Sequence, residues 1–339
     1  MSASIRDVAK EANVSVSTVS RALNGYSDVN EDTRRKIEDV AARIGYTPNL
    51  SARNLSAKVK KNVGLIVSNL LYDKGPDEYT YSLIKGVYTY IAQTDYIISF
   101  TVTTTQEQME KSFDQLCMER SLLGAIFYGL RLSDPYVEKL KVTENPCVTV
   151  DLTVAGDHVR STTTDDAKAF EEITDYIISS GHRKLILVYG RKESVVAQQR
   201  YKGFCDSLQK HEIELSEVQV LDTDFQLDAA YQKTMELLQE KGREAGTAFI
   251  CMSDMTAIGV LHAVTECSYR VPQDFAISGF DGVSAHSLVR PQLATIDQNV
   301  FEKGYEAARL LINMVEGRPD IQNVVVPYSL DKGESVTES

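Results

Sequence analysis

The chain has 339 residues, an ordinary apolar content of 43% and a net charge of −12, which suits a small domain followed by two medium-sized domains. No apolar run approaches the length of a membrane span, and the N-terminus lacks the pattern of a signal peptide. The five cysteines are well separated and form no C-x-x-C pair, which argues against a disulfide framework or a zinc site. We therefore expect a cytoplasmic protein without a metal or other cofactor.

Residues 5–24 predict two short helices joined by a tight turn. Apolar residues recur at helical spacing from Ile5, the pattern breaks at Asn13, and the hydroxyl of Ser15 is suited to cap a second helix. The outer side of that second helix carries small residues and one arginine: Val16, Ser17, Ser20 and Arg21. This pattern is typical of a helix-turn-helix whose second helix enters the DNA major groove, although an ordinary small helical bundle has the same spacing.

A third helix is predicted over residues 31–44, with Asn30 as its cap and Gly45 at its end. Residues 1–46 then form a three-helix unit around a small apolar core. The following segment, 47–61, is basic, has weak helical periodicity and has no core to join, so we interpret it as a linker that touches phosphates.

Charge divides the chain in the same way. Residues 1–61 hold 11 Lys and Arg against 7 Asp and Glu, a net of +4, which leaves 25 against 41, a net of −16, for residues 62–339. An anionic surface repels nucleic acid, so only the N-terminal part is suited to lie against phosphates.

From residue 62 onward, strands and helices alternate. Continuous apolar runs predict buried strands at 62–69, 97–102, 124–128, 147–152, 184–189, 218–222, 247–252 and 274–280. Helices are predicted at 79–93, 106–119, 165–180, 195–210, 229–241, 254–266 and 301–316, and a last strand at 324–326. Buried strands that are each followed by a helix indicate parallel sheets covered on both faces. Two such sets predict two α/β subdomains.

Ligands of open α/β sheets bind beyond the carboxyl ends of the strands. The residues at those ends are rich in carboxylates and amides, among them Asn69, Asp151 and Asp281, and Tyr79 and Phe225 offer flat apolar faces nearby. This combination suits a sugar, because carboxylates accept hydrogen bonds from adjacent hydroxyls while aromatic faces cover C–H patches. We expect few basic residues there, which argues against a strongly anionic ligand.

Several motifs carry a resemblance to a known family. The block DVAKEANVSVSTVSRALN, followed by Tyr46-x-Pro48-Asn49 and Ala52-Arg53-x-Leu55, resembles the lactose-repressor/galactose-repressor (LacI/GalR) family of bacterial transcription regulators, and the match runs along essentially the whole chain. The resemblance implies an α plus α/β architecture: a three-helix helix-turn-helix headpiece, a hinge helix, and a periplasmic-binding-protein-like core of two doubly wound parallel-sheet subdomains.

The implied boundaries are 1–46 for the headpiece, 47–61 for the hinge and 62–339 for the core. Within the core, the resemblance places about 62–163 with 293–322 in the N-subdomain and about 164–292 with 323–339 in the C-subdomain.

The resemblance also implies site residues. By this resemblance, the residues that contact DNA bases are Val16, Ser17, Arg21 and Leu55. The residues that contact DNA phosphates are Ser15, Thr18, Ser20, Asn24 and Arg53. Residues 50–57 would form the hinge helix, with Leu55 as an apolar wedge in a minor-groove base step. Effector contacts fall to Asp151, Arg200, Phe225, Ser253, Asp254 and Asp281, to which the strand-end argument adds Asn69 and Tyr79. A structural role remains open for three of them: Asp254 as a helix cap, Asp281 in a turn with Gly282, and Arg200 as a solvated surface residue.

We therefore expect a dimeric repressor of a sugar-utilisation operon that binds a pseudo-palindromic operator and changes its DNA affinity when a saccharide binds. A regulator that answers to a non-sugar corepressor or to a phosphoprotein is the alternative. A plain solute-binding protein is disfavoured by the predicted headpiece and the missing signal peptide. An enzyme is disfavoured because the chain lacks a phosphate-wrapping G-x-x-x-x-G-K-[ST] loop and a G-x-S-x-G nucleophile elbow. The segment after Leu330 has no leucine heptads, so a dimer is expected instead of a tetramer.

Overall fold

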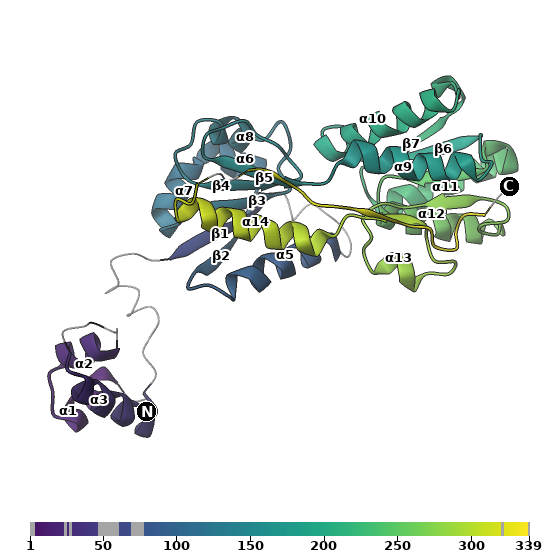
Figure 1. Cartoon of the computed structure of the whole chain (residues 1–339). Coiled ribbons are helices and arrows are strands. Elements are labelled where there is room, and N and C mark those ends of the chain that lie inside the picture. Colours follow the sequence, from purple (N-terminus) through teal and green to yellow (C-terminus); the bar gives the residue numbers. More distant parts are fainter. Residues whose placement is uncertain are drawn as a thin grey trace. The chain divides into compact units, whose positions relative to one another are not determined.

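The computed structural model describes residues 4–23, 26, 29–46, 61–68, 78–319 and 322–337. The chain divides into two compact units, Met1–Lys60 and Lys61–Ser339, which are described separately (Figure 1). None of the described helices combines the length and the apolar character needed to cross a membrane.

The described residues of the first unit form three helices, α1 (Ile5–Ala12), α2 (Val16–Leu23) and α3 (Glu31–Arg43). Both predicted caps are confirmed: the side chain of Ser15 accepts a hydrogen bond from the Thr18 amide (3.1 Å), and that of Asn30 accepts one from the Asp32 amide (2.8 Å). The three helices share one small core of Val8, Ala9, Ala12, Val19, Ala22, Ile37, Val40 and Ala41. So few apolar residues give a small unit only modest stability.

The second unit begins with a subdomain built on a six-stranded parallel sheet. Its strand order is β11 (Val324–Val325), β5 (Val159–Thr163), β4 (Cys147–Val150), β3 (Ala125–Tyr128), β1 (Asn62–Ser68) and β2 (Ile97–Thr103). Alternate residues of β1 point to opposite faces, where Leu65 packs with α5 (Glu78–Ile91) and α14 (Val300–Val315), and Ile66 packs with α7 (Phe113–Arg120) and α8 (Pro135–Leu140). Gly86 lets α5 and α14 touch, because a Cβ there would lie 2.0 Å from the carbonyl oxygen of Phe301.

The other subdomain is built on a four-stranded parallel sheet. Its order is β7 (Gln219–Asp222), β6 (Leu185–Tyr189), β8 (Ala248–Cys251) and β9 (Ala276–Ser278). Helices α9 (Asp166–Ser179) and α10 (Val195–Lys210) cover one face, while α11 (Leu227–Lys241) and α12 (Asp254–Glu266) cover the other. The short helix α13 (Ala285–Leu288) and an antiparallel pair, β10 (Thr295–Asp297) with β12 (Ser329–Asp331), complete it.

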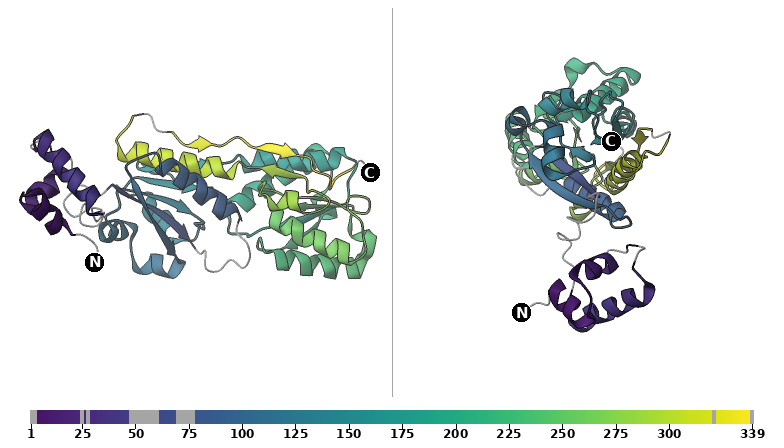
Figure 2. Two further views of the ribbon diagram at one scale, coloured as in Figure 1. Left: turned by 90° about the horizontal axis from the view of Figure 1, so that it is seen from below. Right: turned by 90° about the vertical axis from the view of Figure 1, so that its left-hand side faces the viewer.

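The chain passes between the two subdomains three times: between β5 and α9, between β10 and α14, and between β11 and β12 (Figure 2). Two segments belong to a different subdomain from the one that the resemblance implied. Residues 294–297 belong to the second subdomain, because Ala294 bridges to Ser278 and Asp297 to Asp281, whereas β11 belongs to the first, because it pairs with β5. These pairings join residues far apart in the sequence, so local patterns carry no signal for them.

Two further predictions of elements were wrong or incomplete. The helix predicted over 106–119 is two helices, α6 (Thr105–Glu110) and α7, because Lys111 is extended and Ser112 caps the second with a hydrogen bond from the Gln115 amide (3.1 Å). The prediction also omitted β5. The sequence of β5, VRSTT, is polar and has no apolar run, although Ser161 and Thr162 are buried in the sheet.

Candidate functional site

A cavity of about 280 Å³ lies between the two subdomains, at the carboxyl ends of their strands. Six of the eight predicted effector residues line it: Tyr79, Asp151, Arg200, Phe225, Ser253 and Asp281. The first two belong to the first subdomain and the other four to the second, so a molecule in the cavity contacts both. Asn69 lies outside the described residues.

Three of these side chains project from strained backbone. Asp151 follows β4 with a φ of 59°, Phe225 follows β7 with a φ of 62°, and Asp281 follows β9 with a φ of 122°. Non-glycine residues rarely adopt positive φ, and such residues concentrate at functional sites, where the surrounding structure holds them. Three such positions on one cavity make it the candidate binding site of the core.

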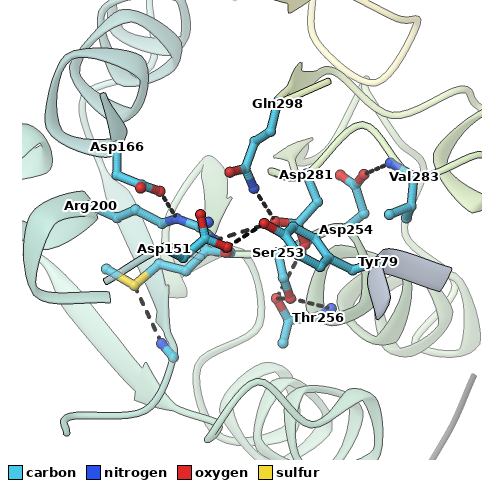
Figure 3. A network of polar contacts seen from close by, with 12 residues as sticks. Tyr79, Asp151, Asp166, Arg200, Ser253, Asp254, Thr256, Asp281, Val283 and Gln298 are labelled. Carbon is cyan, nitrogen blue, oxygen red and sulfur yellow. Dashed lines mark hydrogen bonds and ion pairs between the residues drawn. The ribbon is translucent and has the colours of Figure 1, made fainter. Parts of the chain in front are cut away.

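Arg200 is the centre of a buried charge cluster in the second subdomain (Figure 3). Its Nε donates to Asp166 Oδ1 (2.8 Å), one terminal nitrogen donates to the Met252 carbonyl (2.5 Å), and the same nitrogen lies 3.5 Å from Asp281 Oδ1. The guanidinium also lies 3.9 Å from the centre of the Phe280 ring. Arg200 is only 3% exposed, so the surface role that the sequence left open is excluded.

Lys303 is the centre of a second cluster, in the first subdomain. The side chain is fully buried, and its ammonium donates to Asp151 Oδ1 (2.6 Å), Tyr79 Oη (3.0 Å) and Gln298 Oε1 (2.9 Å). The Tyr79 hydroxyl in turn donates to the other oxygen of Asp151 (Figure 3). Burial, and then the charge of Asp151, raise the pKa of Tyr79 well above its usual value, so this hydroxyl stays a donor.

The side chain of Gln298 joins the two clusters. Its Oε1 accepts from Lys303, and its Nε2 donates to Asp281 Oδ1 (2.7 Å; Figure 3). Gln298 lies on the passage between β10 and α14, so the link coincides with a connection between the subdomains. A second link is made by Glu78 on α5, whose carboxylate accepts from the amides of Ser284 and Ala285 (3.1 Å each) beside α13.

Asp254 does not line the cavity. It is fully buried, and its carboxylate accepts from the Thr295 hydroxyl (2.6 Å) and the Val283 amide (3.0 Å), which fixes the loop after β9. The cap of α12 is Ser253, whose hydroxyl accepts from the Thr256 amide (3.2 Å). The geometry therefore favours a structural role for Asp254 and a double role for Ser253.

The expectation of few basic residues was wrong. Arg131, Arg191 and Arg200 line the cavity, and Lys303 lies behind its wall. Arg131, which follows β3 after a short turn, and Lys303 were not predicted from the sequence. For Lys303 a signal existed: it lies three residues after Val300 and four before Ala307, on the stripe of α14 that is otherwise apolar. Among the described residues no group of His, Cys, Asp and Glu side chains is arranged to hold a metal ion.

The predicted DNA-reading face of α2 can be located in the first unit. Val16 is 42% exposed, Ser17 and Arg21 are exposed, and Thr18 and Ser20 are half-buried. The guanidinium of Arg21 lies 5.4 Å from the centre of the Tyr26 ring. Asn24, Arg53 and Leu55 lie outside the described residues, so their predicted contacts stay predictions.

Comparison with known proteins agrees with this arrangement. A model of bacterial regulatory proteins of the lacI family matches residues 4–49, and a model of a periplasmic binding protein-like domain matches residues 174–336. The chain therefore resembles regulators of the LacI family in its N-terminal unit and periplasmic binding proteins in its core. Proteins of the LacI family are DNA-binding regulators and not enzymes.

The similarity extends over full-length proteins. The chain is 29% identical to catabolite control protein A of Staphylococcus epidermidis over 332 residues, which is 98% of each chain. It shares its fold with the lac repressor dimer bound to operator and the anti-inducer ONPF (24% identity, TM-score 0.84, 99% of this chain and 100% of that one). It also shares the fold of a LacI-family regulator from Enterococcus faecium with bound ribose (22% identity, TM-score 0.71, 82% and 99%).

Replacing the buried ammonium tests the first cluster. Lys303→Met leaves the mostly buried carboxylate of Asp151 without a cation to balance its charge, so we expect the free energy of unfolding to fall by about 3–5 kcal/mol. Adding Asp151→Asn removes that charge and should restore part of the loss. The exposed Lys168→Met on α9 serves as the control and should change stability by less than about 0.5 kcal/mol. Denaturant titration measures these three variants, the single variant Asp151→Asn and the native protein, and strictly additive losses in the double variant would contradict the ion pair.

Stability should also depend on pH through Asp281. Burial raises its pKa to about 7, with Arg200 and Lys303 opposing the rise and Asp166 and Asp151 adding to it. Below pH 7 the folded protein therefore keeps a proton that the unfolded chain releases near pH 4, so the free energy of unfolding falls as the pH rises between these values. The slope is at most about 1.4 kcal/mol per pH unit, and it levels off above pH 7.

The variant Asp281→Asn mimics the protonated form and removes this slope. The difference in unfolding free energy between the native protein and the variant should therefore change between pH 5 and 8. The partly exposed Asp206→Asn is the matched control. A difference that stays constant across this range for Asp281→Asn would show that Asp281 does not titrate there.

Proposed function

We propose that this protein is a cytoplasmic, dimeric transcription repressor that binds a pseudo-palindromic operator and changes its DNA affinity when a sugar fills the cavity between its subdomains. The observation that carries the proposal is the lining of that cavity. Carboxylates from both subdomains, each held by a buried cation, face one space together with stacked aromatic rings.

The carboxylates retain capacity for ligand hydroxyls. The side chains of Asp151 and Asp281 are 14% and 13% exposed, and each carboxylate oxygen has two lone pairs, of which its protein partners leave some unused. Lys303 and Arg200 keep these acceptors in place before a ligand arrives. Such fixed acceptors suit adjacent sugar hydroxyls, because little further ordering is needed on binding.

The aromatic rings supply the apolar part of the site. Tyr79 and Tyr128 stack with centroids 5.8 Å apart and planes inclined by 13°. Phe225 packs on Gly190, where a Cβ would lie 2.2 Å from the ring, so a larger residue at this position would displace the ring. A flat face next to fixed acceptors matches the alternation of C–H patches and hydroxyls on a sugar ring. The structural relative that holds ribose has the same fold.

Regulation follows from the position of the cavity. A ligand that contacts both subdomains binds their closed arrangement more tightly than an open one and shifts the population toward it. A coupling of about 1–3 kcal/mol between effector and operator would change DNA affinity roughly 5- to 150-fold.

A sugar screen tests the effector. Neutral and charged mono- and disaccharides are added to the full chain in a thermal-shift assay. We expect at least one to stabilise it, and at pH 8, where Asp281 is mostly ionised, Asp281→Asn should weaken the hit about tenfold or more, because a charged acceptor is lost. Asp206→Asn should leave the affinity unchanged. The sugar proposal is wrong if no member of the panel raises the melting temperature of the native protein.

Selection of operators from random duplexes tests the headpiece. Arg21→Ala should flatten the preference at one base position in each half-site, as expected for lost base readout, at a cost of about 1–3 kcal/mol. Arg43 on α3 is exposed and paired with Glu11 (3.1 Å), so Arg43→Ala is the matched control and should keep the preference. An unchanged base profile for Arg21→Ala would exclude Arg21 from base readout.

A further inference from the structure

Arg131 is a cation in the cavity wall with an incomplete set of partners. Its backbone is fixed, because its amide donates to Asp134 Oδ2 (3.0 Å) and its carbonyl accepts from the Asp134 amide (3.0 Å). Among the described residues, its buried side-chain Nε finds no acceptor and its guanidinium forms no ion pair. Buried donors without an acceptor are rare in folded proteins, and a charged one is costly.

The acidic side chains that line the same cavity already have partners. Glu78 accepts from two amides beside α13, Asp151 is paired with Lys303, and Asp281 accepts from Gln298 and lies near Arg200. None of these carboxylates is paired with Arg131. The described residues of the cavity lining therefore offer no carboxylate to balance the positive charge of Arg131. A bound ligand can supply that negative charge.

A neutral sugar and an anionic sugar would have opposite effects on this charge. A neutral ligand that fills the cavity removes water from the guanidinium and returns no charge, which is unfavourable. An anionic oxygen accepts from the guanidinium in a charge-assisted hydrogen bond, and the planar fork of arginine matches both phosphoryl and carboxylate groups.

We propose that the effector is a monosaccharide that carries one anionic group, phosphoryl or carboxylate, held by Arg131. The inference rests on the proposed function and narrows its ligand class. The volume of about 280 Å³ lies just below the range of about 300–1,000 Å³ for small-molecule sites, which fits one sugar ring with one substituent.

A second arginine supports this placement from the opposite subdomain. Arg191 follows β6 and lines the same cavity, and its Nε lies 2.6 Å from Asp224, whose side chain is 60% exposed. Arg131 follows β3 in the first subdomain. An anion at Arg131 therefore strengthens the attraction between the two walls, and its binding favours closure.

The experiment uses the full chain and calorimetric titration with matched sets of aldohexoses and aldopentoses. Each neutral sugar is compared with its terminal phosphate ester and its uronic acid. We expect at least one charged form to bind 10-fold or more tightly than its neutral parent. Arg131→Gln should weaken the charged ligand about 10- to 100-fold and the neutral parent less than threefold.

Two further variants complete the design. Arg131→Lys retains the charge without the fork and should bind with an intermediate affinity. The exposed Arg318→Gln, which loses only a surface pair with Glu316, should bind like the native protein. Melting curves of all variants show whether each is folded, and Arg131→Lys replaces Arg131→Gln if the latter is not.

The outcomes separate this inference from the function on which it rests. The inference is overturned if neutral sugars bind as tightly as their charged forms in both the native protein and the Arg131 variants. That result would leave the proposed function as a sugar-responsive regulator unaffected. Absence of binding by every sugar overturns both. The preferred charged form, phosphate ester or uronic acid, identifies the anionic group.

Discussion

The buried ammonium of Lys303 is the interaction on which the arrangement of the core depends. It lies at the start of α14 and holds Asp151 from the end of β4 and Gln298 from the passage between the subdomains. A buried charge has to remain paired, because its separation from a partner in a water-poor interior is strongly unfavourable. The cavity wall, the passage and the first turn of α14 are therefore positioned as one unit.

The same chemistry explains why the cavity is prepared for a ligand before one binds. Asp151 and Asp281 lie in conformations that non-glycine residues rarely adopt, and each is held there by donors from other elements. The fold thus bears the strain of these positions. Because the acceptors are already oriented, a larger share of the interaction with a ligand remains as net binding free energy.

Local signals in the sequence were sufficient for the elements and for much of the site. The caps at Ser15 and Asn30 and the apolar runs of the strands predicted the headpiece and both sheets, and the residues at the strand ends, together with the family resemblance, predicted six cavity residues. What failed depended on contacts across the chain. Lys303 and Asp151 are 152 positions apart, and Gln298 has no local feature that distinguishes it. Arg131 was missed because the turn after β3 separates it from its strand.

The strength of the links between the subdomains decides whether a small molecule can change the arrangement of the two subdomains. Besides the covalent passages, the described contacts across the cleft include one amide, Gln298 to Asp281, and one carboxylate, Glu78 to two amides. Each such hydrogen bond contributes about 0.5–1.5 kcal/mol net, or about 1.5–3 kcal/mol where a charge takes part. A ligand whose affinities for the closed and open forms differ by a few kcal/mol is comparable with this sum, so it can shift the population of the two forms. A tightly packed apolar interface in place of these few polar links would hold the subdomains together regardless of the effector, and the sensor would lose its response.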